Sequence, residues 1–193
     1  MAGYTERVGS ILLAGHPSSS GYQLIQQNVD GVGFNRTWIE YKNGFGNVSG
    51  DFWIGNDALN NMTRNNTCRL KVDLQSKSTL QWFVAYYQYF MVDSAALFYK
   101  LHVSNYTGGN ATDSLAGGFF YGGSSGYMFS TYDQNHNTFN LNCAAIYGGG
   151  WWYSSCGYAI MNAAYQINSG YAFSWHTLPS DPYLKTSKMW LFC

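Results

Sequence analysis

The chain has 193 residues, and its ten basic and ten acidic side chains cancel to a formal net charge of zero. Only 10% of the residues are charged, which argues against nucleic acid and anionic membranes as partners. The same composition favours sugars or neutral protein surfaces. The length fits one domain with a sizeable core and leaves no room for a second.

Residues 1–20 end in Pro17 and three serines, a pattern that predicts a loose leader ahead of a single domain at 21–193. The only apolar run of this leader, at residues 11–15, is too short for the hydrophobic region of a signal peptide. We therefore expect a mature fragment or a truncated N-terminus. No apolar stretch is long enough to predict a membrane span.

Sequence patterns predict five strands along the chain, at 22–29, 68–74, 80–90, 98–103 and 189–193. A short helix is predicted at 34–41 and a second at 56–63, the latter capped by Asn56. Strands separated by short helices indicate an α+β fold around a twisted antiparallel sheet.

The first predicted helix carries Phe34, Trp38 and Tyr41 at helical spacing. Such an aromatic stripe is more often part of a core than a binding face. Aromatic residues make up 19% of the chain, and their rings stack on sugars as well as fill cores. The composition therefore permits a sugar-binding protein without requiring one.

Residues 108–126 are rich in glycine and predict a loop. Residues 122–126 match the Gly-x-Ser-x-Gly pattern of serine hydrolases, but residues 127–129 do not continue as the helix that a nucleophile elbow needs. The four histidines have no nucleophile at a supporting spacing, and they are His16, His102, His136 and His176. We therefore do not expect an enzyme.

Six asparagines begin Asn-x-Ser/Thr glycosylation sequons, whereas roughly two to three would occur by chance. They are Asn35, Asn47, Asn61, Asn65, Asn105 and Asn110. This excess favours a secreted, glycosylated surface. Four cysteines agree with an oxidising, extracellular location.

Asp133, Asn135 and Asn137 place side-chain oxygens at every second position, and Phe139 can add its carbonyl oxygen. This is the spacing by which a loop wraps a hard cation, so a weak calcium site is one interpretation. The glycine and the bidentate glutamate of an EF-hand loop are missing. The other interpretation is a polar turn whose side chains bond their own backbone.

Cys143 and Cys156 flank the run Gly-Gly-Gly-Trp-Trp-Tyr at 148–153. A disulfide between them would close a small loop and stabilise it by roughly 3 kcal/mol. A zinc site is poorly supported because neither cysteine has a partner at C-x2-C spacing. The large rings either fill the core or line a pocket.

The remaining cysteines, Cys68 and Cys193, predict a second disulfide by economy. The alternative is a free Cys193 that links two chains, which would make the protein a homo-oligomer.

Three segments resemble the fibrinogen C-terminal (fibrinogen-related) domain found in ficolins, tachylectin-type lectins and mollusc defence lectins. They read DGVGFNRTWIEYKNGFGNVSGDFWIGND, FSTYDQNHNTFNLNCA and GGGWWYSSC. The resemblance runs from residue 21 to residue 189 and implies a long, loop-rich C-terminal binding region beside the sheet. The cysteine pair that the family carries upstream is absent, so the N-terminal subdomain is expected to be reduced or rebuilt.

The resemblance implies a calcium site at Asn135, Asn137 and the carbonyls of Phe139 and Leu141. Relatives with this site have carboxylates where Asn135 and Asn137 stand, so two negative charges are lost here. Asp133 is the one acidic side chain placed to compensate. Calcium is therefore the only cofactor that we consider.

The resemblance also implies a pocket for an N-acetyl group, with a cis peptide between Ser155 and Cys156. Its parts in this chain would be Tyr147, Cys156, Gly157, Tyr171 and Ala172, with Tyr183 as a further wall. Gly157 stands where acetyl-binding relatives have a histidine. The pocket of fibrinogen itself uses acidic and amide side chains where Ile146 and Tyr147 stand here, so the amino end of a peptide would meet no counter-charge.

The first functional interpretation is a secreted, non-enzymatic lectin, a pattern-recognition module of innate immunity that binds acetylated or neutral glycans or glycoproteins. The alternative is an extracellular protein-interaction domain, receptor-binding or part of a matrix or filament, whose ligand pocket has degenerated. Loss of the histidine and of the calcium carboxylates favours the alternative, and retention of Tyr147 with the Tyr171 and Ala172 pair favours the lectin.

Overall fold

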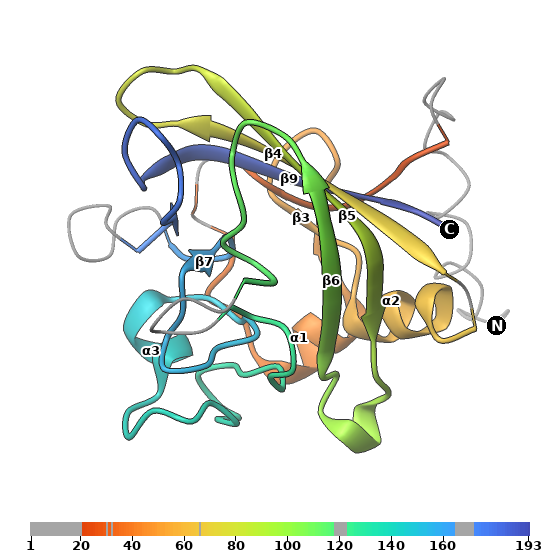
Figure 1. Cartoon of the computed structure of the whole chain (residues 1–193). Helices are drawn as coiled ribbons and strands as arrows, with labels where there is room; N and C mark the ends of the chain where they lie inside the picture. Colours follow the sequence, from red (N-terminus) through yellow and green to blue (C-terminus); the bar gives the residue numbers. More distant parts are fainter. Residues whose placement is uncertain (1–20, 30, 32, 66, 118–122, 165–171) are drawn as a thin grey trace, which may run out of the picture.

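The computed structural model of the protein describes residues 21–29, 31, 33–65, 67–117, 123–164 and 172–193, so the expected leader at 1–20 lies outside the described residues. A seven-stranded sheet is its main feature (Figure 1). In spatial order its strands are β2 (Phe45–Gly46), β3 (Phe52–Trp53), β1 (Gln23–Asn28), β9 (Leu184–Phe192), β4 (Cys68–Ser76), β5 (Trp82–Val92) and β6 (Leu101–Gly108). All neighbours pair antiparallel, which confirms the expected α+β fold with an antiparallel sheet.

The interior strand β4 shows why these residues form a sheet that is covered on one side. Its alternate side chains Leu70, Val72 and Leu74 are buried, while the residues between them are exposed or half-buried. This two-residue period matches a sheet with one face on the core and one toward solvent. The exposed face of β5 carries Trp82 and Tyr86.

Three strands begin two or more residues away from their predicted starts. Strand β5 starts at Trp82 because Leu80 lies in the turn, with a left-handed φ of 60°. Strand β6 starts at Leu101 because the short 3-10 helix η2 (Ala95–Leu97) and two left-handed residues precede it. The closing strand β9 starts at Leu184, five residues before the predicted position, because its polar Ser187 is buried and hydrogen-bonded to Gln26.

Helix α1 (Trp38–Asn43) begins four residues later than predicted because Thr37 is its N-cap. Thr37 and Glu40 form a capping box, in which Glu40 Oε2 accepts from the Thr37 N–H at 2.8 Å. This hydrogen bond lowers the pKa of Glu40. Phe34 and Tyr41 are fully buried, so the aromatic stripe belongs to the core.

Helix α2 (Asn56–Thr63) has the predicted bounds, but the predicted cap is wrong. Gly55 is the N-cap and no side chain caps the helix. The Asn56 side chain is instead buried, where its Oδ1 accepts from Trp53 Nε1 at 3.2 Å. The same indole N–H also donates to the Tyr41 carbonyl at 3.2 Å, so it is shared between two acceptors.

The described residues between 109 and 183 form the predicted loop-rich region, which lies on one side of the sheet in Figure 1. Within it are helix α3 (Cys143–Tyr147) and the paired strands β7 (Ala159–Ile160) and β8 (Ser174–Trp175). Buried amides tie this region to strand β1, because Gln26 Nε2 donates to the Met161 carbonyl and to Asn162 Oδ1. None of the helices that the structure describes has the length and hydropathy of a membrane crossing.

Candidate functional site

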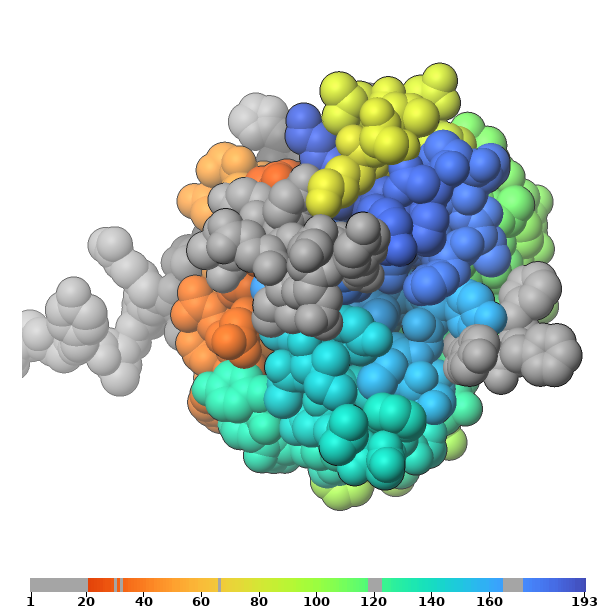
Figure 2. All heavy atoms as spheres, turned by 90° about the vertical axis from the view of Figure 1, so that its left-hand side faces the viewer, coloured from red at the N-terminus to blue at the C-terminus, as the bar shows by residue number. Residues whose placement is uncertain are grey.

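Both cysteine pairs are bonded in the structure. Cys143 joins Cys156 across 13 positions, and Cys68 joins Cys193 across 125. No described cysteine is free, so the structure gives neither a Cys193 thiol to link chains nor a zinc site. We call residues 143–156 the disulfide loop. In Figure 2 the residues around it, green-cyan to light blue, build the lower half of the face turned to the viewer.

Local sequence signals shape the start of the disulfide loop. Asn142 is the N-cap of α3 and accepts from the Ala145 N–H at 3.2 Å, while Gly148 ends the helix with a left-handed φ of 67°. A Cβ on Gly149 would lie 1.8 Å from the Asn162 carbonyl oxygen. A Cβ on Gly150 would lie 2.7 Å from the Tyr41 ring. The glycine run is therefore required by close backbone approach.

The rings that follow the glycines belong to the core. Trp151, Trp152 and Tyr153 have no exposed surface, and each polar atom of these rings is used. Trp152 Nε1 donates to the Tyr99 carbonyl at 2.7 Å, and the Tyr153 hydroxyl donates to the Gly149 carbonyl at 2.7 Å. These rings position the disulfide loop and do not line a pocket.

A pocket of about 240 Å³ opens to solvent beside the Cys143–Cys156 bond. Its lining residues are Tyr147, Ser155, Cys156, Gly157, Tyr158 and His176. Three of the predicted pocket residues, Tyr147, Cys156 and Gly157, are thus brought together. The Tyr147 ring is held by stacking on the Tyr153 ring, with centroids 6.2 Å apart.

Two of the other predicted pocket residues do not join this lining. Ala172 is fully buried and Tyr183 is half-buried, and neither lines the pocket. Tyr171 lies outside the described residues. The predicted cis peptide between Ser155 and Cys156 is wrong, because the described residues contain no cis bond and the chain instead turns at Cys156 with a φ of 67°.

His176 is a pocket residue that the sequence did not reveal. It comes from the turn after β8, and its N–H donates to the Tyr158 carbonyl at 2.9 Å. The two rings meet edge to face at 5.1 Å. This packing removes one side of the imidazole from water, and the desolvation lowers the pKa of His176. The pocket is therefore lined by the neutral imidazole of His176, although Gly157 stands where acetyl-binding relatives have a histidine.

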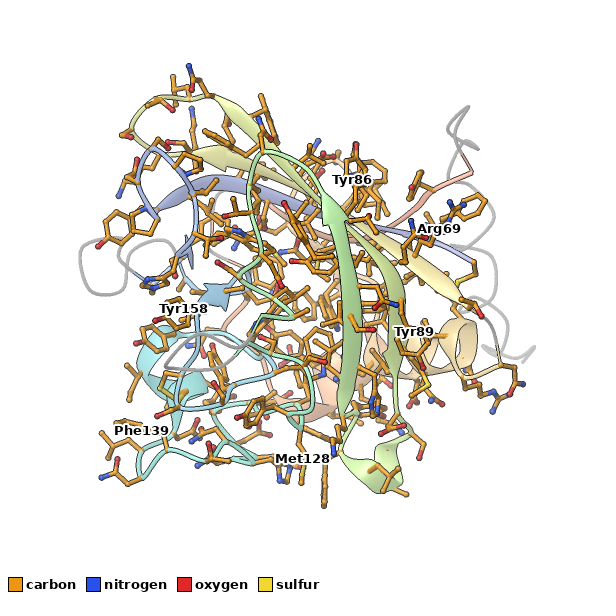
Figure 3. All side chains as sticks on the ribbon, in the orientation of Figure 1. Arg69, Tyr86, Tyr89, Met128, Phe139 and Tyr158 are labelled. Atoms are coloured by element: carbon orange, nitrogen blue, oxygen red, sulfur yellow. A yellow bond between two sulfur atoms is a disulfide. The ribbon has the colours of Figure 1, made fainter. Side chains whose placement is uncertain are left out.

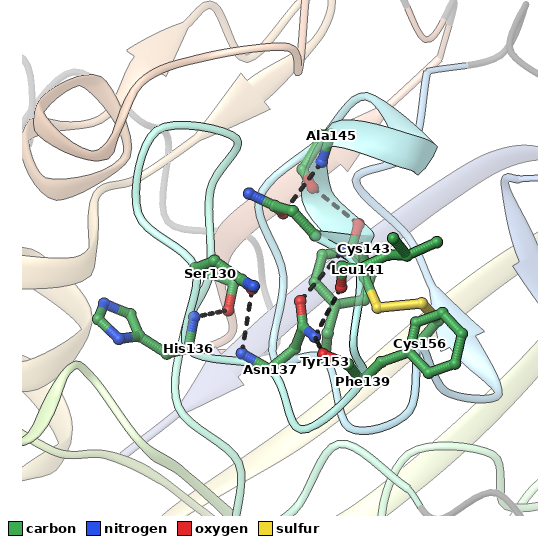
Figure 4. Close-up of a disulfide and its surroundings, with 12 residues drawn as sticks. Ser130, His136, Asn137, Phe139, Leu141, Cys143, Ala145, Tyr153 and Cys156 are labelled. Carbon is green, nitrogen blue, oxygen red and sulfur yellow. Dashed lines mark hydrogen bonds between the residues drawn. A yellow bond between two sulfur atoms is a disulfide. The ribbon is translucent and has the colours of Figure 1, made fainter.

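The predicted calcium loop is closed by its own hydrogen bonds (Figure 4). Asn137 Nδ2 donates to the carbonyls of Phe139 and Leu141, at 3.0 Å each. Asn137 Oδ1 accepts from the Cys143 N–H at 3.0 Å. These two carbonyls are the backbone ligands that the family resemblance assigns to calcium. We call residues 135–142 the amide loop.

The side chains of the remaining predicted metal ligands, Asn135 and Asp133, accept hydrogen bonds from within the chain. Asn135 Oδ1 accepts from the Asn137 N–H at 3.3 Å, a local turn. Asp133 Oδ1 accepts from the Trp38 N–H at 2.9 Å and from the Thr131 hydroxyl at 2.7 Å, so this carboxylate serves the start of helix α1. The described residues hold no cluster of acidic, histidine or cysteine side chains suited to a metal. This donor set does not fit calcium.

A third feature is an apolar surface at one end of the molecule, which we call the end face. Eleven large hydrophobic side chains are exposed in the described part of the chain, and six of them come from residues 97–141. Figure 3 places Met128 and Phe139 at the lower end of the molecule, and the connection between β5 and β6, which holds η2, lies at the same end in Figure 1. The end face comprises Leu97, Phe98, Met128, Tyr132, Phe139 and Leu141.

His136 packs beneath part of the end face. Its ring lies 4.2 Å from the Phe98 ring and 5.4 Å from the Trp38 ring, measured between centroids. Desolvation by these rings lowers the pKa of His136, which is therefore neutral at pH 7. This contact was not foreseen from the sequence, because Phe98 was predicted inside a strand.

Comparison with known proteins identifies the family. Residues 15–191 match the family described as "Fibrinogen beta and gamma chains, C-terminal globular domain". This chain therefore belongs to the fibrinogen C-terminal domain family, as its motifs indicated.

Relatives and solved structures agree with this membership. Protein scabrous of Drosophila melanogaster is 39% identical over 79% of this chain, and the Homo sapiens fibrinogen alpha chain is 37% identical over 86%. The fibrinogen-like globe domain of human ANGPTL2 superposes with a TM-score of 0.76 and 31% identity, covering 89% of this chain and 79% of that domain. A lamprey fibrin D-dimer complexed with the peptide Gly-His-Arg-Pro-amide gives a TM-score of 0.78 at 28% identity, covering 88% and 60%.

The chain spans 18% of the length of scabrous and 20% of that of the human fibrinogen alpha chain. The fibrinogen and angiopoietin-like relatives that match this chain are non-enzymatic. Ser124, the serine of the Gly-x-Ser-x-Gly pattern, is buried and accepts from Trp151 Nε1 at 3.0 Å.

Proposed function

We propose that this chain is an extracellular protein-interaction domain that binds an uncharged protein surface through the end face. One observation carries the proposal: six of the eleven exposed large hydrophobic side chains of the described residues come from residues 97–141, and Figure 3 places two of them, Met128 and Phe139, at one end of the molecule. Exposed apolar patches of this kind are characteristic of protein-binding surfaces. Between residues 114 and 180 the only aspartate, glutamate, lysine or arginine is Asp133. Its carboxylate already accepts two hydrogen bonds, so the partner needs no complementary charge.

Backbone strain marks the tip of the end face. Phe98 and Tyr99 both have left-handed φ values, 51° and 50°, although neither is glycine. Each such residue costs about 1 to 2 kcal/mol, which the surrounding structure has to offset. The strain holds the Phe98 side chain 40% exposed at the end of the β5–β6 connection.

The positions of the glycosylation sequons are consistent with a binding role for the end face. All six sequon asparagines are exposed, and all six lie between residues 35 and 110. No sequon occurs from residue 111 to residue 193, which includes the amide loop, the disulfide loop and most of the end face. Residues 111–193 would themselves carry no glycan of this type.

The relatives also favour a protein partner outside the cell. Fibrinogen, angiopoietin and scabrous, which match this chain, are secreted proteins. One structure with the same fold holds a peptide ligand. These likenesses support an extracellular protein-binding role and leave the identity of the partner to experiment.

Two matched aspartate variants test the proposal. Phe98→Asp places a charge in the end face, and Leu80→Asp places one in the β4–β5 turn, which is remote in Figure 1. Both residues are left-handed and similarly exposed, 40% and 51%, so both substitutions carry the same backbone cost. Binding to an array of extracellular receptor domains should fall about thirtyfold for Phe98→Asp, because a buried interface charge costs about 2 kcal/mol.

The Leu80→Asp variant should bind like the wild type. Equal binding by both variants, with both proteins folded, would rule out the end face. The wild-type affinity should also change less than about twofold between about 50 and 500 mM NaCl, because an uncharged contact is not screened by salt. A steep salt dependence would contradict an uncharged partner surface.

A lectin is the second candidate function, and the open pocket is the observation that favours it. Tyr147, Cys156 and Gly157 gather around a cavity large enough for an acetamido group. A glycan array with and without chelator separates the two functions. Selective binding of N-acetylated sugars that Tyr147→Ala abolishes, with Phe98→Asp unaffected, would establish the lectin.

A further inference from the structure

The amide loop contains a side-chain arrangement that replaces a metal ion. Asn137 and an aspartate have the same shape, but the second terminal atom of asparagine is an NH2 donor where aspartate has an acceptor oxygen. In this chain the Asn137 Nδ2 donates to the Phe139 and Leu141 carbonyls at 3.0 Å each. The two carbonyls are therefore satisfied by the protein itself.

The amide cannot turn around to present its oxygen to a cation without loss. Asn137 Oδ1 accepts from the Cys143 N–H at 3.0 Å, and this N–H belongs to the first residue of helix α3. A rotated amide would set its NH2 group against that N–H and leave both carbonyls without a donor. Three hydrogen bonds together fix the observed orientation.

We infer that the Asn137 side chain does the structural work of a cation, so that the amide loop keeps its shape without calcium. The carbonyls of Phe139 and Leu141 are drawn inward to the amide. Their side chains remain 41% and 56% exposed and belong to the end face. Asn137 is thus a positioning residue for the end face, and this consequence rests on the proposed function. The inference that the loop keeps its shape without calcium does not depend on the proposed function.

Amide hydrogen exchange of the free protein tests the positioning role. Asn137→Ala removes all three hydrogen bonds, so exchange at Cys143 should become about tenfold faster than in the wild type. Asn140→Ala is the matched control, since Asn140 is an exposed asparagine of the same loop. It should leave the rate at Cys143 unchanged. Unchanged exchange in Asn137→Ala would overturn the inference.

Restoring carboxylates should convert the loop into a calcium-dependent one. In the double variant Asn135→Asp/Asn137→Asp, the new carboxylate at position 137 faces two carbonyl oxygens and repels them without a cation. Its melting temperature in EDTA should fall several degrees below that of the wild type and recover on addition of about 1 mM CaCl2, within the affinity range of extracellular sites. The same addition should leave the wild-type melting temperature and calorimetric baseline unchanged.

Calcium binding by the wild type, seen as heat in calorimetry and a melting temperature that chelator lowers, would overturn the inference. So would a double variant that is as stable in EDTA as the wild type. These readouts use the free protein, so they stand whether or not the end face binds a partner. If both loop tests succeed while Phe98→Asp binds normally, the proposed function fails and the metal-free loop remains.

Discussion

The amide loop precedes Cys143 in the chain and the pocket residues follow it. The two regions differ in whether their polar groups are satisfied within the chain. In the amide loop every group that the family resemblance assigned to calcium has found a partner within the chain, through Asn137 and Asn135. In the pocket, Gly157 leaves a gap and the space remains open to solvent. The comparison teaches that family resemblance carries over the position of a site, whereas single atoms decide whether the site still needs a ligand.

The strongest test of how both regions are held is Gly149→Ala. The new Cβ would lie 1.8 Å from the Asn162 carbonyl, so the backbone has to move and we expect a loss of about 4 kcal/mol or more in the free energy of unfolding. Gly157→Ala is the control, because its Cβ would lie 3.6 Å from Ser154 Oγ and only the φ of 88° is strained, at about 1 kcal/mol. Urea unfolding of both variants gives the two values, and equal losses would contradict this assignment.

Removing the Cys143–Cys156 bond should separate the two regions. The double serine variant should lose about 3 kcal/mol of unfolding free energy on the chain-entropy model, against about 5 kcal/mol for the Cys68 and Cys193 pair, which closes a longer loop. Chemical denaturation without reductant measures both. Hydrogen exchange should rise at Gly157 and stay slow at the backbone amide of position 143, which donates to Asn137. Equal loosening of both sites would show that the amide loop depends on the disulfide.

Gly157→His sharpens the comparison at the pocket. The Ser154 Oγ contact at 3.6 Å leaves room for a side chain, and histidine is the residue of acetyl-binding relatives at this position. Under the proposed function the wild type should show no binding of N-acetylglucosamine in calorimetry. The variant should gain a weak affinity on the order of 1 mM, about 4 kcal/mol. Tight binding by the wild type would show that the pocket is already complete.

The smallest expected effect concerns the two histidines, one beneath the end face and one at the pocket. Burial lowers the pKa of both His136 and His176, so the folded protein binds fewer protons than the unfolded chain at mildly acidic pH. Stability should therefore be complete above about pH 7 and fall as the pH drops through about 6.5, by less than about 1 kcal/mol per histidine. Thermal unfolding of His136→Gln and His176→Gln across this range should show a flatter pH dependence, and an unchanged one would contradict the assignment.

Local patterns predicted most of the fold because they express burial directly. The alternation of β4, the bounds of α2 and the burial of Phe34 and Tyr41 all follow from apolar period. Helix α3 was missed, although Asn142 and Gly148 are recognisable caps, because five residues are too few to show a period.

Other features could not be predicted because they depend on contacts between distant residues or on the orientation of one group. His176 reaches the pocket only through the turn after β8. The Asn56 side chain does not cap helix α2 and instead accepts a hydrogen bond from the buried Trp53 indole. From sequence alone, the Asn137 amide could act as a metal ligand or as a hydrogen-bond donor. The hydrogen bond from the Cys143 N–H fixes its orientation in the structure. The sequence thus pointed to the amide loop and to part of the pocket lining, and it did not predict the end face.

The central claim, that the end face and not the pocket binds the partner, is tested most directly by a hydrogen-exchange footprint. The domain would be measured alone and in complex with the receptor domain that the array selects. We predict slowed exchange at residues 95–98 and 128–141, with no change at residues 147–158. Protection confined to residues 147–158, with 95–98 and 128–141 unchanged, would contradict the account.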